Sequence, residues 1–157
     1  MKINYKKLII SILIPLLVGG VSAFLTRNSM ATFESVAKPP LSPPGWLFPV
    51  VWTILYILMG IASYLVSISK GPKTLSDSAL AIYALQLVFN FFWSIIFFNM
   101  EAYLFAFVWL IALWLLILWT TVSFYKINKT AGLLMIPYLI WVAFAGYLNF
   151  GIYLLNR

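Results

Sequence analysis

Long apolar runs without a charged residue alternate with short polar segments along this 157-residue chain. There are five such runs: Leu8–Thr26, Gly45–Ser69, Ser78–Met100, Ala102–Tyr125 and Ala131–Asn156. Each run is close to or above the ~20 residues that a helix needs to cross a bilayer. A segment inside lipid must also satisfy its own backbone hydrogen bonds, as a helix does. The pattern therefore predicts an all-α membrane protein, a bundle of five transmembrane helices that forms a single domain over residues 1–157.

The composition excludes a soluble protein and several kinds of site. Hydrophobic residues make up 64% of the chain and charged residues 8%, whereas soluble domains carry about 25% charged residues. Cysteine and histidine are absent, which excludes disulfides, thiolate chemistry and zinc or axial haem ligation by these residues. We expect no metal site and no cofactor.

The first run has two interpretations. A lysine-rich start, an apolar stretch and the small residues Val21-Ser22-Ala23 resemble a secretory signal with a cleavage site. The alternative is an uncleaved first helix. We favour the helix because the apolar character continues to Thr26, and because Gly19 and Ala23 provide a face for close helix packing.

The net charge of +7 raises the question of a nucleic-acid partner, but the basic residues are distributed by side of the membrane. If successive runs alternate in direction, seven basic residues lie on one side: Lys2, Lys6, Lys7, Lys70, Lys73, Lys126 and Lys129. Three lie on the other: Arg27, Lys38 and Arg157. This bias predicts a cell-membrane protein with a cytoplasmic N-terminus, an external first loop and an external C-terminus. We expect no nucleic-acid partner.

The connection at residues 27–44 is the longest polar segment and is rich in proline. Long loops in compact proteins are usually functional or disordered. Proline fixes φ and favours extended backbone, so we expect a stiff, ordered lid over the outer mouth of the bundle. The residues assigned to this lid are Lys38, Pro39, Pro40, Pro43, Pro44 and Trp46.

Three of the runs carry aromatic and amide side chains at helical spacing, in the half of the bilayer beneath this lid. These candidate ligand-binding residues are Phe48, Trp52 and Tyr56 on the second run, Gln86, Asn90 and Trp93 on the third, and Tyr138, Trp141, Ala145 and Asn149 on the fifth. An apolar, aromatic cavity with a few placed polar groups is typical of small-molecule sites. The alternative is that the amides form interhelical hydrogen bonds and the tryptophans pack or anchor the helices.

The tryptophans of the fourth run follow a different pattern. Trp109, Trp114 and Trp119 are spaced by five residues, which places them on different faces of a helix. We expect them to face lipid or another subunit.

Three motifs resemble those of the tryptophan-rich sensory protein and translocator protein family, which includes the peripheral benzodiazepine receptor. The motifs are Lys38-Pro39-Pro40-Leu41-Ser42-Pro43-Pro44-Gly45-Trp46 with Trp52 and Tyr56, Gln86-Leu87 with Asn90 and Trp93-Ser94, and Pro137-Tyr138-Leu139 with Trp141 and Asn149. Together they extend over nearly the whole chain. The chain departs from the family pattern at Leu41 and Thr32-Phe33, where many members have tryptophan or tyrosine, and at Trp109, where many have an acid.

The resemblance implies a five-helix homodimer that binds porphyrins such as protoporphyrin IX, and also synthetic benzodiazepine-site ligands. Some members bind cholesterol, so a membrane lipid or sterol is a further expected partner. Trp52, Tyr56, Asn90 and Trp141 would contact the ligand, and the pair Trp52 and Trp141 would be linked to light-dependent porphyrin breakdown. The family also occurs in mitochondrial and bacterial outer membranes.

Three functions therefore remain open: a porphyrin sensor or translocator, an enzyme of light-dependent protoporphyrin degradation, and a transporter of porphyrins or sterol-like lipids. Hydrolytic or acid–base catalysis is excluded because the acids are Glu34, Asp77 and Glu101, in loops or at helix ends, with no histidine partner. Radical chemistry at Trp52 and Trp141 needs no such groups, so enzyme status stays open. We prefer the sensor or translocator.

Overall fold

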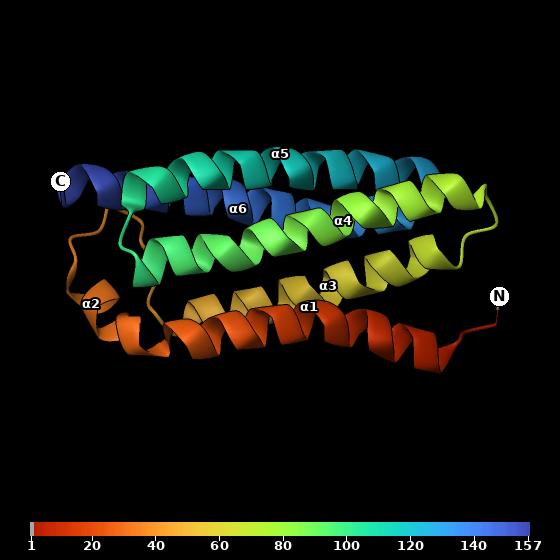
Figure 1. Ribbon diagram of the computed structural model, residues 1–157, viewed down its shortest axis with the longest axis horizontal. Helices are drawn as coiled ribbons and strands as arrows, with labels where there is room; N and C mark the ends of the chain where they lie inside the picture. Colours follow the sequence, from red (N-terminus) through yellow and green to blue (C-terminus); the bar gives the residue numbers. More distant parts are fainter. Residues whose placement is uncertain (1) are drawn as a thin grey trace.

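Five long helices run back and forth along one axis in the computed structural model, which describes residues 2–157 (Figure 1). They are α1 (Tyr5–Thr26), α3 (Leu47–Ser67), α4 (Lys73–Ser94), α5 (Tyr103–Ile127) and α6 (Lys129–Leu155). All of them are long and apolar enough to cross a membrane, and the described residues contain no strand. The predicted fold class is confirmed.

The long connection after α1 differs from the prediction in its first half. Helical structure continues from α1 through the 3₁₀ turn η1 (Arg27–Ser29) and the short helix α2 (Met30–Ser35). Extended backbone begins only at Val36, with φ −75° and ψ 151°. The expectation of a loop over residues 27–44 is therefore wrong for residues 27–35, because no proline or glycine interrupts the helix between Gly20 and Pro39. The prolines restrict only the second half of the connection.

The start of α4 also differs from the prediction. The helix begins at Lys73, directly after Pro72 and ahead of the apolar run that starts at Ser78. The Pro72 carbonyl accepts hydrogen bonds from the amides of Leu75 (3.1 Å) and Ser76 (3.4 Å). Near its other end, α4 passes into the π-helical turn η2 (Ile95–Asn99). The apolar run predicted too short a helix, because the polar residues of the first turn of α4 lie outside the run.

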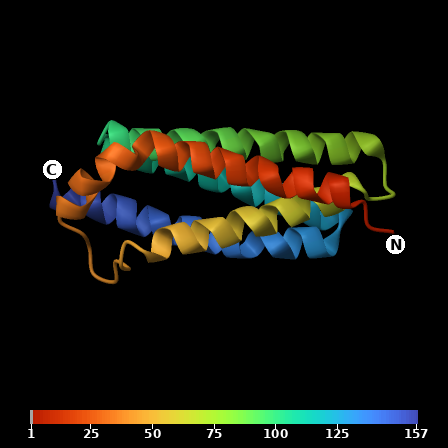
Figure 2. The ribbon, with the colours of Figure 1, turned by 90° about the horizontal axis from the view of Figure 1, so that it is seen from below.

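The two ends of the bundle are formed by different segments of the chain (Figures 1 and 2). One end holds the N-terminus and the turns between α3 and α4 and between α5 and α6; we call it the basic end, because the seven lysines grouped above lie there. The other end holds α2, the segment 36–46, the turn between η2 and α5, and the C-terminus; we call it the lid end. In Figure 2 the segment 36–46 forms a loop outside the helices at this end.

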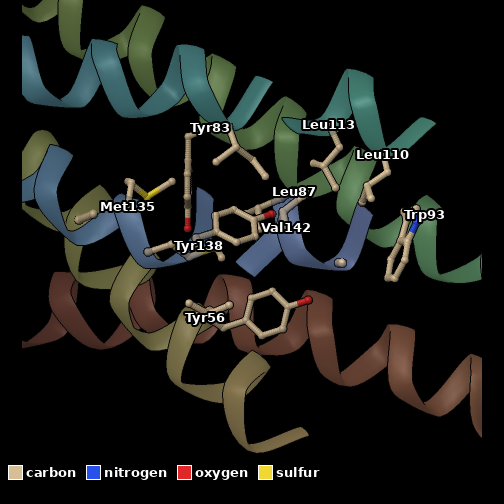
Figure 3. Packing of buried hydrophobic residues seen from close by; sticks show 14 of the residues in the cluster. Tyr56, Tyr83, Leu87, Trp93, Leu110, Leu113, Met135, Tyr138 and Val142 are labelled. Atoms are coloured by element: carbon tan, nitrogen blue, oxygen red, sulfur yellow. The ribbon is translucent and has the colours of Figure 1, made fainter. Parts of the chain in front are cut away.

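The core lies between α3, α4, α5 and α6 (Figure 3). Met59, Leu113 and Met135 are fully buried there, and Tyr138 is 1% exposed. Helix α1 is peripheral: only 11% of its most apolar stretch is buried inside the protein, against 33–44% for the other four long helices. It packs mainly on α3. A helix with so little protein contact presents most of its surface to lipid.

The interface between α1 and α3 depends on a close approach of the two backbones. A Cβ atom added to Gly60 would lie 2.6 Å from the Ile12 Cα atom and 2.8 Å from the Ser11 carbonyl oxygen. Near the basic end, the Asn4 amide donates to the Tyr64 hydroxyl at 2.9 Å. Small residues at crossings are a general means of helix association in membranes, where lipid removes the hydrophobic drive between helices.

Two of the three tryptophans on α5 face other helices, contrary to prediction. Trp109 stacks on Phe89 of α4, with ring centroids 4.4 Å apart, and donates its indole N–H to the Phe89 carbonyl at 2.8 Å. Trp114 donates to the Leu139 carbonyl of α6 at 3.0 Å. Trp119 is 58% exposed, as expected. The spacing of five residues does place the three rings on different faces of α5. Two of these faces pack against other helices, because α5 lies between α4 and α6.

Adding one methyl group at Gly60 should separate α1 from α3. We expect Gly60→Ala to lower the midpoint of thermal unfolding, because its Cβ would meet backbone atoms that cannot rotate away, an overpacking cost of about 1–3 kcal/mol. Gly20→Ala is the matched control, since nothing lies within 4 Å of its added Cβ. Circular dichroism of the two variants in detergent checks this; equal midpoints would show that the close approach is not needed.

Candidate functional site

A cavity of about 500 Å³ lies at the lid end of the bundle. Its walls come from the lid-end halves of α1, α3, α4 and α6, together with η1, α2, η2 and the segment 36–46. The volume falls in the usual range for small-molecule sites. Seven of the ten candidate ligand-binding residues line it: Phe48, Trp52, Tyr56, Trp93, Trp141, Ala145 and Asn149.

Aromatic rings form most of the wall between α3 and α6. Trp52 stacks on Tyr56 with centroids 5.6 Å apart, and Phe48 meets the edge of Trp141 at 5.9 Å. On the opposite side, Trp93 stacks on Phe97 at 5.2 Å. These contacts hold the rings against one another, so the wall is ordered before any ligand arrives.

Trp141 carries a polar group without a partner. Its indole N–H is buried and has no hydrogen-bond acceptor among the described residues. A buried donor left unpaired costs about 1–3 kcal/mol. The Trp141 ring therefore offers the cavity a flat surface, while its N–H is buried away from that space.

The remaining three candidates lie behind the cavity and do not line it. Tyr56 donates its hydroxyl to Asn90 Oδ1 at 3.1 Å, and the Asn90 amide donates to the Tyr138 hydroxyl at 2.7 Å. Tyr138 in turn donates to Gln86 Oε1 at 2.6 Å. Gln86, Asn90 and Tyr138 are each 1% exposed or less. They form an interhelical hydrogen-bond chain, and their contact with a ligand stays a prediction.

This chain fixes the floor of the cavity. It joins α3, α4 and α6, and its cavity-side member is Tyr56, on which Trp52 stacks. Figure 3 shows Tyr56 and Tyr138 on neighbouring helices in the centre of the bundle. The Tyr56 ring lies against Gly19 of α1, where a Cβ would overlap it. The position of Trp52 thus depends, through Tyr56, on Asn90 and Tyr138, which do not line the cavity.

Asn149 combines a place in the cavity wall with a structural role. Its Oδ1 accepts from the Trp93 indole N–H at 3.1 Å, and its Nδ2 donates to the Tyr103 carbonyl at 2.8 Å. These bonds join α6 to α4 and α5. Both the oxygen and the nitrogen of the Asn149 side-chain amide are therefore engaged. The bond to the oxygen orients the Trp93 ring in the cavity wall.

Two cations lie at the mouth of the cavity, and each is held by backbone carbonyls. Arg27 donates to the Phe24 carbonyl at 2.6 Å, with its guanidinium 3.8 Å from the Phe24 ring centroid. Lys38 donates to the carbonyls of Glu34 (3.1 Å) and Val36 (3.2 Å). Both cations line the cavity, as does Glu34. The mouth therefore carries a net positive charge.

The lid is attached to α6. Tyr147 donates to the Pro40 carbonyl at 2.6 Å, and Asn156 exchanges two hydrogen bonds with the backbone of Ala37, at 3.0 and 2.7 Å. Pro39 is buried against Gly151, where a Cβ would lie 2.5 Å from the proline Cγ. These contacts with α6 and its C-terminal end hold the segment 36–46 in place, in addition to the restriction that proline imposes on the backbone.

Only part of the lid faces the cavity. Lys38 and Pro43 line it, whereas Pro39, Pro40, Pro44 and Trp46 do not. Trp46 is 68% exposed. Pro39 instead packs against Gly151 of α6, so these four residues belong to the lid segment without forming the cavity wall.

Sequence reasoning missed the contribution of the first helix. Gly19, Ser22, Ala23 and Thr26 of α1 line the cavity, and so does Met30 of α2. These α1 residues are small and recur at spacings of three and four residues, which places them on one face of a helix. That stripe was visible in the sequence and was interpreted only as a packing surface.

Comparisons with known proteins identify relatives of this chain. The sequence profile of the TspO/MBR family matches residues 11–155. A tryptophan-rich protein TspO from Archaeoglobus fulgidus is 43% identical over 98% of this chain and 99% of its own. The protein CrtK of Rhodobacter capsulatus is 40% identical over 80% of this chain and 79% of its own. The translocator protein of Bos taurus is 34% identical over 88% of this chain and 83% of its own.

Removing the Tyr138 hydroxyl should weaken the bundle without changing the rings of the cavity wall. We expect Tyr138→Phe to lower the free energy of unfolding by about 0.6–2 kcal/mol, because one buried amide N–H of Asn90 and the Gln86 carbonyl each lose a partner. Tyr125→Phe, at a tyrosine that is 46% exposed, is the control and should change little. Denaturant titration in mixed micelles measures both; the same small effect at the two positions would contradict a structural role for the chain.

Proposed function

Because the chain belongs to the TspO/MBR family of integral membrane proteins, we propose that it binds a porphyrin such as protoporphyrin IX in the lid-end cavity and acts as a sensor or translocator in the control of porphyrin levels. The observation that carries this proposal is a cavity with an aromatic wall and a cationic mouth. A flat, apolar ligand with carboxylates at one edge has the chemistry to match both.

The aromatic wall supplies the surface on which a macrocycle would stack. The rings of Phe48, Trp52 and Trp141 all line the cavity, and stacking on a fully engaged aromatic side chain contributes about 1–3 kcal/mol, by analogy with nucleic-acid bases. The neighbours of these rings already hold them in place, so little side-chain entropy would be lost on binding.

The mouth supplies partners for carboxylates. Within residues 2–157, the hydrogen bonds of the Arg27 and Lys38 side chains go to backbone carbonyls and not to acids. Arginine has five N–H donors and lysine three, so donors remain for a ligand. Charge-assisted bonds of this kind are the stronger class of hydrogen bond. The ligand would lie with its carboxylates toward the lid and its ring between α3 and α6.

A second candidate function is light-dependent degradation of the bound porphyrin. It is favoured by the presence of two oxidisable indoles, Trp52 and Trp141, in the same cavity wall. This reaction would consume the ligand that the first function only holds, so one set of measurements distinguishes them.

Phenylalanine substitutions at the two wall tryptophans test both functions. We expect Trp52→Phe and Trp141→Phe to weaken protoporphyrin IX binding about two- to tenfold, since a smaller ring still stacks and the full ring is worth ~1–3 kcal/mol. If the protein degrades the ligand, the same changes should strongly slow bleaching, because phenylalanine is much harder to oxidise. The measurements are spectral titration of the purified protein in the dark and the decay of the Soret band under light.

Trp119→Phe is the control, because Trp119 is 58% exposed and does not line the cavity. It should leave affinity and bleaching unchanged. Equal losses at Trp52, Trp141 and Trp119, or loss of helicity before loss of binding, would place the porphyrin elsewhere.

We further propose that the basic end lies in the cytoplasm and the lid end outside, from the seven-to-three distribution of basic residues. The chain has no cysteine, and Leu41 is 84% exposed at the lid end. A cysteine introduced by Leu41→Cys should react with a membrane-impermeant maleimide in intact cells, whereas Lys70→Cys at the basic end should react only after permeabilisation. The reverse pattern would refute this orientation.

A further inference from the structure

A second cavity, of about 470 Å³, opens at the basic end of the bundle. Its lining comes from α1 with the residues before it, from α3 and from α4, and shares no residue with the lid-end cavity. None of the candidate ligand-binding residues is part of it. It is a separate feature that the porphyrin proposal does not use.

Its rim is cationic. Lys6 and Lys7 both line the cavity, and the Lys7 ammonium lies 3.3 Å from the Ser67 carbonyl at the end of α3. The charged residues that flank this region on α4 are Lys73 and Asp77, and neither is in the lining. The Asn4 side chain caps α1 by accepting from the Lys7 amide at 3.1 Å, which fixes the turn that carries both lysines.

The walls beneath the rim are mainly apolar. Ile10 and Ile14 of α1 face Leu80 and Leu87 of α4 across the cavity. From Lys6 to Ile14 the helix rises about 12 Å, close to the ~15 Å hydrocarbon thickness of one bilayer leaflet. The cavity thus has the depth of one leaflet, with its charge at the membrane surface.

The deeper part holds one polar group without a partner. The Tyr83 hydroxyl is buried and makes no hydrogen bond within the described residues. Its neighbour Ser63 also lines the cavity, but the Ser63 hydroxyl donates to the Gly60 carbonyl at 2.8 Å. The deeper wall of this cavity thus contains a buried hydroxyl that the described residues leave without a hydrogen bond.

We propose that this cavity is a binding site for an anionic phospholipid of the surrounding leaflet. One acyl chain lies between α1 and α4, and the phosphate is held by Lys6 and Lys7. The membrane supplies this ligand at high local concentration, and basic residues near the surface attract acidic headgroups. Because only 11% of the most apolar stretch of α1 is buried inside the protein, the lipid completes the packing of that helix.

The charge arm of the test uses native mass spectrometry of the full chain released from detergent with phosphatidylglycerol or phosphatidylcholine of identical acyl chains. The unmodified protein should retain phosphatidylglycerol preferentially. Lys6→Gln with Lys7→Gln should reduce its binding about fivefold for each lysine removed, from ~1 kcal/mol per basic residue. Lys126→Gln with Lys129→Gln removes the same charge at the same end, outside the cavity, and should have little effect.

The shape arm fills the cavity without changing charge. Ala84 lines it and is exposed, whereas Ala81, one turn earlier on α4, is exposed and does not line it. Ala84→Phe should reduce phosphatidylglycerol binding several-fold, and Ala81→Phe should not. Circular dichroism verifies that each variant folds, and if the double lysine variant does not fold, the alanine pair decides alone.

Three results would overturn the proposal. The first is equal binding of the two lipids by the unmodified protein, and the second is an equal loss in the Lys126 and Lys129 variant. The third is undiminished phosphatidylglycerol binding by Ala84→Phe, which would mean that acidic lipids associate with the basic surface only and do not enter the cavity.

Discussion

Polar groups inside a bilayer must find their hydrogen-bond partners within the protein, and the arrangement of this bundle follows from that constraint. The chain formed by Tyr56, Asn90, Tyr138 and Gln86 joins three helices at the centre of the molecule. The tryptophans of α5 obey the same rule, since Trp109 and Trp114 donate to backbone carbonyls of α4 and α6. These directional bonds hold the helices in register where lipid offers no hydrophobic drive for association.

The constraint also explains why the open spaces lie at the two ends. The central layer is closed by the tyrosine and amide chain, and neither cavity includes Gln86, Asn90 or Tyr138. The peripheral helix α1 contributes lining residues to both cavities. Each cavity has cations at its rim, Arg27 and Lys38 at one end and Lys6 and Lys7 at the other. The same scaffold thus offers an aromatic site on one side and an aliphatic one on the other.

The fold could be predicted from the sequence because charge-free runs of bilayer length leave helix as the only stable form. The cavity was predicted in part: residues at helical spacing such as Phe48, Trp52 and Trp141 share a face whatever the tertiary structure. The burial of Asn90 and Tyr138 behind the cavity was not predictable from the sequence. Helical spacing shows which face of a helix a residue lies on, but not how far that residue is from the cavity. Helical spacing also cannot show which side chains on neighbouring helices hydrogen-bond to one another. The helical structure of residues 27–35 was hidden by the prolines that follow them.

Two of the departures from the family pattern, Leu41 and Trp109, lie outside the lid-end cavity. Leu41 is 84% exposed and adopts a left-handed φ of 69°, in a turn closed by the Ser42 hydroxyl on the Pro39 carbonyl at 2.7 Å. Its side chain points away from the cavity, so an aromatic residue is not needed there to complete the wall.

Trp109 stacks on Phe89 and donates a hydrogen bond to the Phe89 carbonyl. An acid at this position could not fill this structural role by stacking. Phe33, in contrast, lines the cavity and packs against Phe48, Phe97 and Phe98. Phenylalanine therefore supplies the ring that this part of the wall requires, and the aromatic character on which the proposed site depends is retained.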